Sequence, residues 1–600
     1  MIDAPARTCR DLSLALALAA ALFAVYAAGA ARTIAVGDSG ELVTATWVFG
    51  VPHPTGYPVY ILLARLWSTL LPVGSVAFRV SLFSAACAAL ACAVLFLVCR
   101  RLGAGRAAAL TGAGCLAFAP SFWGEANIQR VYALNALFLA VALWLACGWW
   151  WRLRSPHPDP LPAGAGALPL TVFVAALGAG NHTFMAVFGI VFAGWALWQA
   201  PALVLRPRTL ALVVAAVVVG LLPYAWLPLA ARREPPLLWG DPGSLSGFLD
   251  IVLRRDFWGR AWVASPADVA MVAADWAVSF GRELTWVGAA VALLGAIAAA
   301  RRRQAPVALL LAVMVANLAS MVLHGSRSDL FVWHRYYIPS YLAAALFVGL
   351  GAEALTRRAP RPLRLLPLLL PVLLFATGWA RFDRRNDRIA DTVARAILDQ
   401  VPLGGILLAA DDSVLYPLLY VTLVEGHRAD VRVALLNSVA LPTAADFDPQ
   451  ATPVVFTHPP DLADDGLVAV PVGLTFRLWK RDLPPPPASP VVEEVPGIGD
   501  IVAPDVLTRH LIGHVHFTQG LTLADTDWAR ARRHFERAAA VAADHDALQF
   551  NLGVFYLRRG MMAEGIAALE QADRISPRGL ESAPAVRAAD LLAQVRAAAR

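Results

Sequence analysis

Asp38 and Glu41 are the first residues in the chain whose types and spacing could do chemistry. They follow a long apolar run, where a carboxylate is costly unless it faces water, protein or a binding site. A carboxylate in such a place can remove a proton from an attacking hydroxyl group. A structural interpretation is also open, because Ser39 can cap a helix that begins near Gly40 and puts Glu41 in its first turn. The two residues are therefore either a catalytic pair or the start of a helix beside a proline-rich loop.

Further polar residues lie in the short connections between apolar runs. They are His53 and Tyr57, Glu125 and Arg130, His182, and Arg327 and Arg335. Taken singly, each is typical of an interfacial anchor or of a histidine with a buried partner. Together at one membrane face they suit a phosphorylated lipid, because arginine binds phosphate oxygens in a bidentate geometry.

The elements that must position these residues are helices that span a membrane. Of the 600 residues, 16% are charged and 58% are hydrophobic, whereas a soluble globular protein has about 25% charged residues. A helix needs roughly 20 apolar residues to cross the hydrocarbon core. We predict about eleven spans: Leu12–Ala31, Ala77–Val98, Ala107–Pro120, Val131–Trp151, Leu168–Gly180, Thr183–Gln199, Thr209–Ala231, Trp286–Ala300, Ala305–Leu323, Ile338–Leu355 and Leu365–Trp379. The third and fifth are short enough to be tilted, half-buried or re-entrant.

The arginines predict the orientation of these spans, because basic short loops stay in the cytoplasm. If the N-terminus is cytoplasmic, alternation places every strongly basic short connection on that side: Arg7 and Arg10, Arg100 to Arg106, Arg152 and Arg154, Arg206 and Arg208, Arg301–Arg303, and Arg357–Arg364. We therefore expect a multi-pass protein of the cell (inner) membrane, with its C-terminal domain periplasmic.

The first span has an alternative interpretation as a cleaved signal peptide. Ala28-Gly29-Ala30 offers small residues at a suitable cleavage point. The following loop lies outside the cytoplasm in either case.

Charge and cysteine content exclude several other classes. The net charge of +7 comes from short arginine clusters beside apolar runs, so no nucleic-acid partner is predicted. The six cysteines lie in or beside the membrane part and do not have the usual zinc-ligand spacings. The tail has none, which excludes a disulfide scaffold there. No P-loop, dinucleotide fingerprint or nucleophile elbow is present.

The distribution of charge predicts four parts in the chain. These are a membrane domain over 1–380 with its first outer loop at 32–76, an exported α/β domain over 381–483, a linker over 484–510, and a helical region over 511–600.

Short aliphatic runs bounded by glycine and aspartate predict the strands of the α/β domain. Leu403–Leu408 and Val431–Leu436 are the predicted buried strands. Thr392–Gln400 and Tyr416–Val424 are the predicted helices.

Helical spacing runs through Trp528–Pro577. Gly553, Tyr556, Gly560 and Pro577 fall where a tetratricopeptide (TPR) repeat places such residues, at a period of about 34. We predict one TPR-like repeat with flanking helices, and a generic helical hairpin is the alternative. An isolated repeat is expected to pack or to bind a protein partner rather than to catalyse.

Several motifs resemble the DUF2723 family, a branch of the GT-C glycosyltransferases that includes the eukaryotic protein O-mannosyltransferase TMEM260. The most specific motif is Gly37-Asp38-Ser39-Gly40-Glu41-Leu42 followed by Pro52-His53-Pro54-Thr55-Gly56-Tyr57-Pro58. Later matches are Val131-Tyr132-Ala133-Leu134-Asn135, Gly180-Asn181-His182-Thr183, Tyr336-Tyr337-Ile338-Pro339-Ser340-Tyr341, and Asp411-Asp412, Tyr420 and Val424–Val431. The resemblance extends from about residue 30 to about residue 435.

The resemblance implies a GT-C-like polytopic helical domain whose first outer loop carries the catalytic acid. Such enzymes take a sugar from a polyprenyl-phosphate carrier and pass it to a protein hydroxyl or a glycan outside the cytoplasm. It implies that Asp38 is the general base and that Glu41 is its partner or orients the acceptor. His53 and Tyr57 would shape the donor pocket. Arg327 or Arg335 would hold the lipid phosphate, and no metal or other cofactor is implied.

The chain departs from the family pattern just before Val131, where relatives have a glutamate and this chain has Arg130. Glu125 lies about one helical turn away and is the expected substitute.

Two other functions stay open on the sequence alone. A transporter of a lipid-linked substrate would need charged or helix-breaking residues near the middles of its spans, but here the charges lie at the ends. A membrane scaffold or inactive relative would recruit partners through its repeat and use Asp38 only at a helix start.

Overall fold

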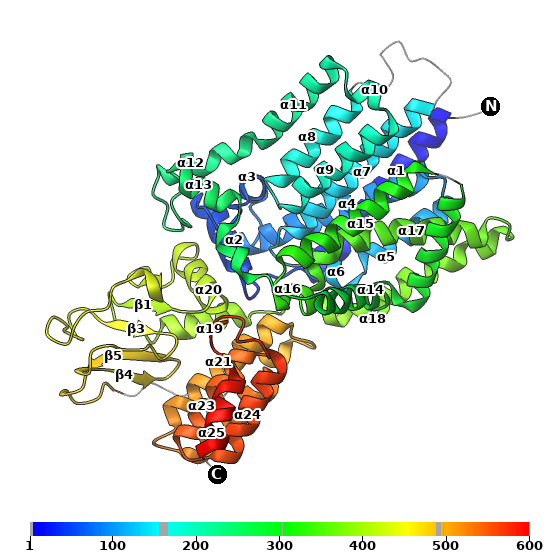
Figure 1. The fold of residues 1–600 in the computed structure, drawn as a ribbon. Helices are drawn as coiled ribbons and strands as arrows, with labels where there is room; N and C mark the ends of the chain where they lie inside the picture. The colour runs from blue at the N-terminus through cyan, green and yellow to red at the C-terminus, as the bar shows by residue number, and fades with distance from the viewer. Residues whose placement is uncertain (1–3, 155–165, 303, 488–493, 496, 599–600) are drawn as a thin grey trace. The chain divides into compact units, whose positions relative to one another are not determined.

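The computed structural model describes residues 4–154, 166–302, 304–487, 494–495 and 497–598 (Figure 1). Arg303 of a predicted basic cluster, and residues 488–493 and 496 of the predicted linker, lie outside these ranges. The chain forms two compact units. The first comprises Met1–Arg32 and Ala45–Arg385, and the second comprises Thr33–Thr44 and Asn386–Arg600. The segment Thr33–Thr44 is thus grouped with the C-terminal part of the chain.

The first unit confirms the predicted polytopic helical fold, since each of the eleven predicted spans is helical. Helices of the N-terminal half are α1 (Ala4–Gly29), α2 (Asp38–Val48, whose start belongs to the second unit), α3 (Pro58–Leu70), α4 (Val76–Arg101), α5 (Arg106–Ala117), α6 (Pro120–Ala126), α7 (Tyr132–Arg154), α8 (Ala167–Ala179), α9 (Phe184–Gln199) and α10 (Pro201–Val204). The others are α11 (Pro207–Leu221), α12 (Trp226–Ala231), α13 (Leu245–Val252), α14 (Pro266–Arg301), α15 (Ala305–His324), α16 (Arg327–Phe331), α17 (Ile338–Thr356) and α18 (Leu369–Phe382).

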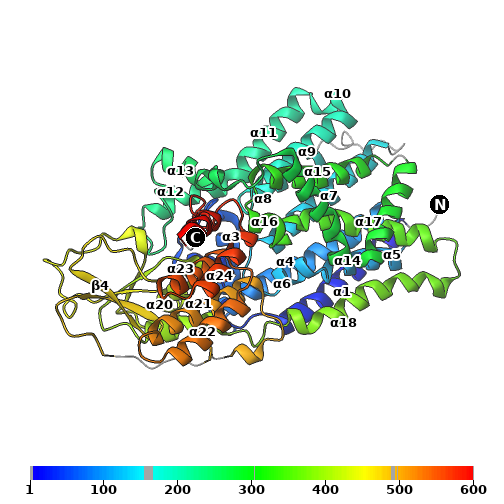
Figure 2. The ribbon, with the colours of Figure 1, turned by 60° about the horizontal axis from the view of Figure 1, so that its bottom comes forward.

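Eight helices within the described ranges are long and apolar enough to cross a membrane. The predicted third, fifth and sixth spans correspond to the shorter helices α5, α8 and α9, with 12, 13 and 16 residues. These lengths fall below the roughly 20 residues of a full span. Helices α8, α9 and α11 nevertheless run side by side in both views (Figure 1, Figure 2).

Helix α14 begins twenty residues earlier than the predicted span at Trp286. Ser265 caps this earlier start in a capping box with Asp268. Thr285 then interrupts the helix with a φ of 62°, just before the apolar stretch that was predicted. Helix α2 also begins earlier than predicted, at Asp38, so Ser39 lies inside the helix rather than capping it.

Close backbone contacts hold α17 in the core of the first unit, where α17, α4 and α7 are the most buried of the long helices. A Cβ atom placed on Gly351 of α17 would lie 2.0 Å from the Val291 carbonyl oxygen of α14. A Cβ on Gly295 of α14 would lie 1.9 Å from the Phe347 carbonyl oxygen. Small residues are typical of such interfaces, because membrane helices associate through close packing.

The second unit contains a mixed sheet with strand order β2-β1-β3-β5-β4. The strands are β1 (Ile406–Ala409), β2 (Arg432–Leu435), β3 (Val454–Phe456), β4 (Leu467–Val472) and β5 (Thr475–Lys480). Strands β2, β1 and β3 are parallel, and β5 pairs antiparallel with both β3 and β4. Helices α19 (Ile389–Leu398) and α20 (Asp412–Leu423) agree with the two predicted helices. The predicted buried strand Val431–Leu436 is instead a largely exposed edge strand.

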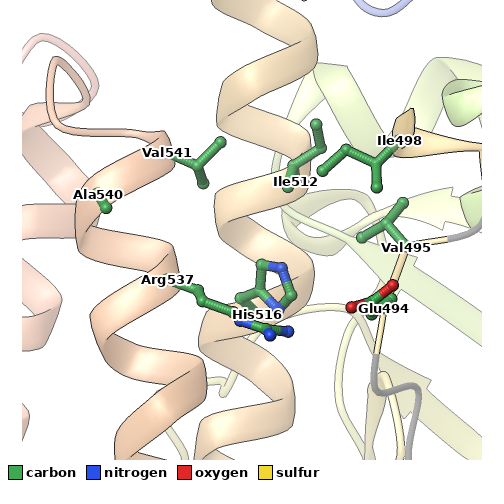
Figure 3. A pocket seen from close by; sticks show the side chains of 8 residues that line it. All are labelled: Glu494, Val495, Ile498, Ile512, His516, Arg537, Ala540 and Val541. Atoms are coloured by element: carbon green, nitrogen blue, oxygen red, sulfur yellow. The ribbon is translucent and has the colours of Figure 1, made fainter. Parts of the chain in front are cut away.

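Five helices follow the sheet: α21 (Val506–Leu523), α22 (Trp528–Val541), α23 (Asp546–Arg558), α24 (Met562–Ile575) and α25 (Ala588–Ala598). The predicted apolar positions Ala531, Phe535 and Leu552 form a common core. A pocket of about 440 Å³ lies between α21, α22 and the segment before α21. Figure 3 shows apolar side chains at one end and Glu494, His516 and Arg537 at the other. None of the predicted site residues lines this pocket.

The α14–α17 contact predicts that a single methyl group destabilises the first unit. Gly351→Ala should lower the free energy of unfolding by about 1–3 kcal/mol, because the methyl group meets backbone that cannot rotate away. Thermal unfolding in detergent measures the effect. Gly194→Ala in α9 is the matched control, since nothing lies within 4 Å of its added Cβ. Unfolding of both variants at the wild-type temperature would contradict the prediction.

Candidate functional site

The loop before α3 brings together two of the predicted site residues, His53 and Tyr57, both of which belong to the first unit. The hydroxyl of Tyr57 lies 2.9 Å from Nε2 of His53, within hydrogen-bond distance. Tyr57 caps α3 in the left-handed conformation, with a φ of 44°, and Pro58 follows as the first helical residue. His53 also contacts the rings of Trp239 and Phe257 at centroid distances of 6.4 and 6.3 Å. The proline-rich loop therefore presents an aromatic wall with a polar edge.

Three aromatic residues from distant segments meet in the first unit. The ring centre of Tyr132, at the start of α7, lies 5.7 Å from that of His182 and 5.5 Å from that of Tyr336. His182 lies in the connection between α8 and α9. Tyr336 belongs to the 3₁₀ turn His334–Tyr337 before α17. All three positions lie in motifs that carry the family resemblance, so the fold brings these motifs together.

Arg335 is the cation at the centre of this group. Its guanidinium lies 5.4 Å from the ring centre of Tyr132, 5.5 Å from that of Tyr336 and 4.6 Å from that of Trp333. One nitrogen is 4.0 Å from a carboxylate oxygen of Glu125, and the residue is only 8% exposed. Aromatic faces stabilise a desolvated guanidinium. Glu125, the predicted substitute for the missing glutamate, thus lies beside Arg335.

A second arginine, Arg254, was missed by the sequence analysis. It lies between α13 and a 3₁₀ turn, with a φ of 56°, and its guanidinium is 5.0 Å from the Phe257 ring centre. Its Nε is buried and has no hydrogen-bond partner in the described parts of the chain. Burial opposes the charge, but electrostatic interactions with Tyr57, Tyr336 and Asp329 raise the pKa of Arg254 above its ordinary value. Arg254 therefore stays charged and keeps donor capacity for an anion.

His182 is neutral at physiological pH. Burial lowers the pKa of His182 to about 3, and the positive charges of Arg254, His53 and Arg335 contribute further. Its Nδ1 accepts a hydrogen bond from the Phe184 backbone N–H at 3.3 Å. The proton of the neutral ring is therefore on Nε2.

The other two predicted arginines, Arg130 and Arg327, differ in their surroundings. Arg130 is buried, and its backbone is within 3.5 Å of the Ser84 hydroxyl. Arg130 and Glu125 both act electrostatically on Tyr60 of α3. Arg327 is the first residue of α16, where it is half exposed, and its side chain has no hydrogen bond or ion pair to any described residue.

The predicted catalytic carboxylates belong to the second unit. Asp38 and Glu41 lie in the first turn of α2, where the helix dipole favours negative charge. Glu41 has no exposed surface, whereas Asp38 is half-buried. The side chain of Tyr416 in α20 lies close to that of Glu41. Burial, followed by the charges of Glu41, Asp412 and Asp38, raises the pKa of Tyr416 well above its ordinary value.

The two groups of residues offer complementary chemistry. The group in the second unit offers a half-buried carboxylate, which can accept a proton from a hydroxyl group. The group in the first unit offers two arginines and aromatic faces, which can bind a phosphate and a sugar ring. Among the described residues, no three His, Cys, Asp or Glu side chains are placed to hold a metal ion.

Comparisons with known proteins agree with the residues that carry the resemblance. Residues 38–202 match the family described as the protein O-mannosyl-transferase TMEM260 N-terminal domain. The chain is 29% identical to mouse protein O-mannosyl-transferase TMEM260 over 440 residues, which cover 69% of this chain and 61% of the mouse protein. It is 25% identical to the Dictyostelium discoideum protein O-mannosyl-transferase tmem260 over 241 residues, which cover 39% of this chain and 29% of that protein. The chain thus spans less than two thirds of either relative.

A solved structure shares the fold. The crystal structure of ArnT from Cupriavidus metallidurans bound to undecaprenyl phosphate superposes with a TM-score of 0.51 at 16% identity. The match covers 81% of this chain and all of that chain. The apo form of the same protein gives a TM-score of 0.50.

The predicted resemblance is therefore confirmed: residues 38–202 match the TMEM260 N-terminal domain, and the chain is a membrane protein that is similar to the TMEM260 protein O-mannosyl-transferases and shares the fold of ArnT.

Proposed function

We propose that this protein is a membrane glycosyltransferase that moves a sugar from a polyprenyl-phosphate donor to an acceptor hydroxyl on a protein or a glycan. The names of its relatives favour mannosyl-type transfer. The solved structure with the same fold was crystallised with undecaprenyl phosphate, which favours a polyprenyl-phosphate donor. The observation that carries the proposal is the carboxylate pair Asp38 and Glu41 within the segment that matches the family.

In this proposal Asp38 is the general base. Its half-buried carboxylate takes the proton of the acceptor hydroxyl, whose oxygen attacks the anomeric carbon of the sugar. The bond between that carbon and the phosphate oxygen breaks, and the polyprenyl phosphate leaves with the negative charge. Buried Glu41 fixes the first turn of α2 and orients the acceptor.

Arg254 and Arg335 hold the phosphate of the donor. Three aromatic rings surround Arg335 and one lies against Arg254, and a hydrogen bond to phosphate in such partly desolvated surroundings is stronger than in bulk solvent. They stabilise the negative charge that develops on the leaving group. His53 and Tyr57 form the wall of the donor pocket, and His182, as a neutral donor, is available for a sugar hydroxyl. We propose that no cofactor is required besides the lipid-linked donor.

The reaction takes place outside the cytoplasm. The basic connections predict a cytoplasmic N-terminus, which places the first outer loop and the tail on the periplasmic side of the inner membrane. The C-terminal helices α21–α25 are proposed to bind the acceptor protein or another protein partner.

Replacing the proposed base tests the reaction class. Asp38→Asn keeps the shape and hydrogen-bonding capacity of the side chain but removes its basicity, so transfer should fall about 10²- to 10⁴-fold. Purified protein in detergent is assayed with a panel of polyprenyl-phosphate sugars, with thermal unfolding as the control for folding. Equal rates of transfer in the wild type and the variant would remove Asp38 from the mechanism.

The proposed phosphate contact predicts a loss of donor binding in Arg254→Gln. A hydrogen bond to a charged group contributes about 1.5–3 kcal/mol, so affinity for undecaprenyl phosphate should fall about 10- to 100-fold. The adjacent Arg255 supplies the matched control, because it is exposed and pairs with Asp250 at 2.6 Å. Arg255→Gln should bind like the wild type. Equal affinities for all three proteins would exclude Arg254 from the phosphate site.

A further inference from the structure

Helix α2 and helix α20 touch at their backbones, although many residues separate them in the chain. A Cβ atom on Gly40 would lie 2.5 Å from the Tyr416 carbonyl oxygen and 3.0 Å from the Pro417 nitrogen. Only glycine permits this approach, because both atoms are rigid backbone. Gly40 lies between the two carboxylates of α2, so the contact fixes the turn that carries Asp38 and Glu41.

The side chain of Tyr416 faces the same turn. It is 3% exposed and lies close to Glu41, which has no exposed surface. Because burial and the charges of Glu41, Asp412 and Asp38 raise the pKa of Tyr416, its hydroxyl keeps its proton. A protonated hydroxyl beside a carboxylate donates its hydrogen bond.

The position of α20 is set by the sheet of the second unit. The helix follows β1, the central strand of the parallel part, and Asp411 caps it by accepting from the Ser413 N–H at 2.7 Å. The chain crosses from β1 to β2 on one side and returns to β3 on the other. The carboxyl ends of β1 and β3 are therefore a topological switch point, the usual place for ligands in such sheets. Here that edge carries the start of α20.

We propose that Tyr416 is a positioning residue for the catalytic carboxylates: its hydroxyl donates to Glu41 and, with the Gly40 contact, holds the first turn of α2 so that Asp38 can accept the proton of the acceptor. The inference rests on the proposed function, which it deepens by assigning part of the catalytic geometry to the soluble tail. Tyr416 neither forms nor breaks a bond in the reaction.

The test compares two tyrosine-to-phenylalanine variants on one helix. Tyr416→Phe removes the hydroxyl and keeps the ring. Tyr420→Phe is the matched control, because Tyr420 is also buried on α20 and its hydroxyl donates to Glu425 at 2.7 Å. Steady-state transfer against pH is measured for both variants, the wild type and Asp38→Asn. Hydrogen–deuterium exchange of residues 38–44 is measured in the same four proteins.

We expect Tyr416→Phe to lower kcat about 10- to 100-fold with little change in the KM for donor, since small misplacements of a catalytic group cost this much. Exchange of residues 38–44 should be faster in Tyr416→Phe. Tyr420→Phe should match the wild type in all three measurements.

Other outcomes overturn the inference and separate it from the proposed function. If Asp38→Asn loses transfer while Tyr416→Phe behaves like the wild type, the proposed enzymatic function is supported and the positioning role of Tyr416 is excluded. An equal loss of kcat and an equal change in exchange in both tyrosine variants would show that Tyr416 only stabilises the fold of α20. If the wild type transfers no sugar, the proposed function fails, and exchange still decides whether Tyr416 holds α2: unchanged exchange in Tyr416→Phe excludes it.

Gly40→Ala tests the backbone contact independently of the hydroxyl. The added methyl group must push α2 away from α20, so exchange of residues 38–44 should accelerate and kcat should fall at least tenfold. Gly194→Ala is again the neutral glycine control. Wild-type exchange and kcat in Gly40→Ala would contradict the arrangement of these two helices.

Discussion

Glu41 has no exposed surface, and a carboxylate in such a place is tolerated only where donors and favourable dipoles replace the water it has lost. The Tyr416 hydroxyl provides one donor, and the N-terminal end of α2 provides a favourable dipole. Supplying that donor requires α20 to approach α2 closely, which explains why Gly40 has no side chain. The contact of α2 with α20 is consistent with the grouping of Thr33–Thr44 with the tail.

The same physical requirement shapes the arginine cluster of the first unit, but with different partners. Arg335 loses its water and gains three aromatic faces and the carboxylate of Glu125. His182 meets the requirement by giving up its charge, since it is buried among cations. A positive and largely buried group of side chains of this kind favours an anionic ligand, because a negative charge replaces the water that the arginines have lost.

The long apolar runs and the short motifs were predictable from the sequence, because each depends on neighbours in the chain. Arg254 was not, since its partners Tyr57, Tyr336 and Asp329 come from other segments and its own surroundings show no periodic pattern. Tyr416 lies in an apolar helix that was predicted, yet nothing local indicates that it faces Glu41. The early start of α14 did have a local signal in the Ser265–Asp268 capping box. Strand β3 depends on pairing with distant segments, and this pairing leaves little trace in three residues. Strands β4 and β5 form a local hairpin, which the sequence analysis missed.

The division of the chain into units has a consequence for how such proteins can exchange parts during evolution. A module normally moves as one continuous stretch of gene, because its contacts are internal to that stretch. The second unit is discontinuous, since it includes Thr33–Thr44 from far upstream. A tail acquired from a relative would meet a foreign first loop at Gly40 and Glu41, so recombination within this lineage is constrained to keep both segments from the same parent.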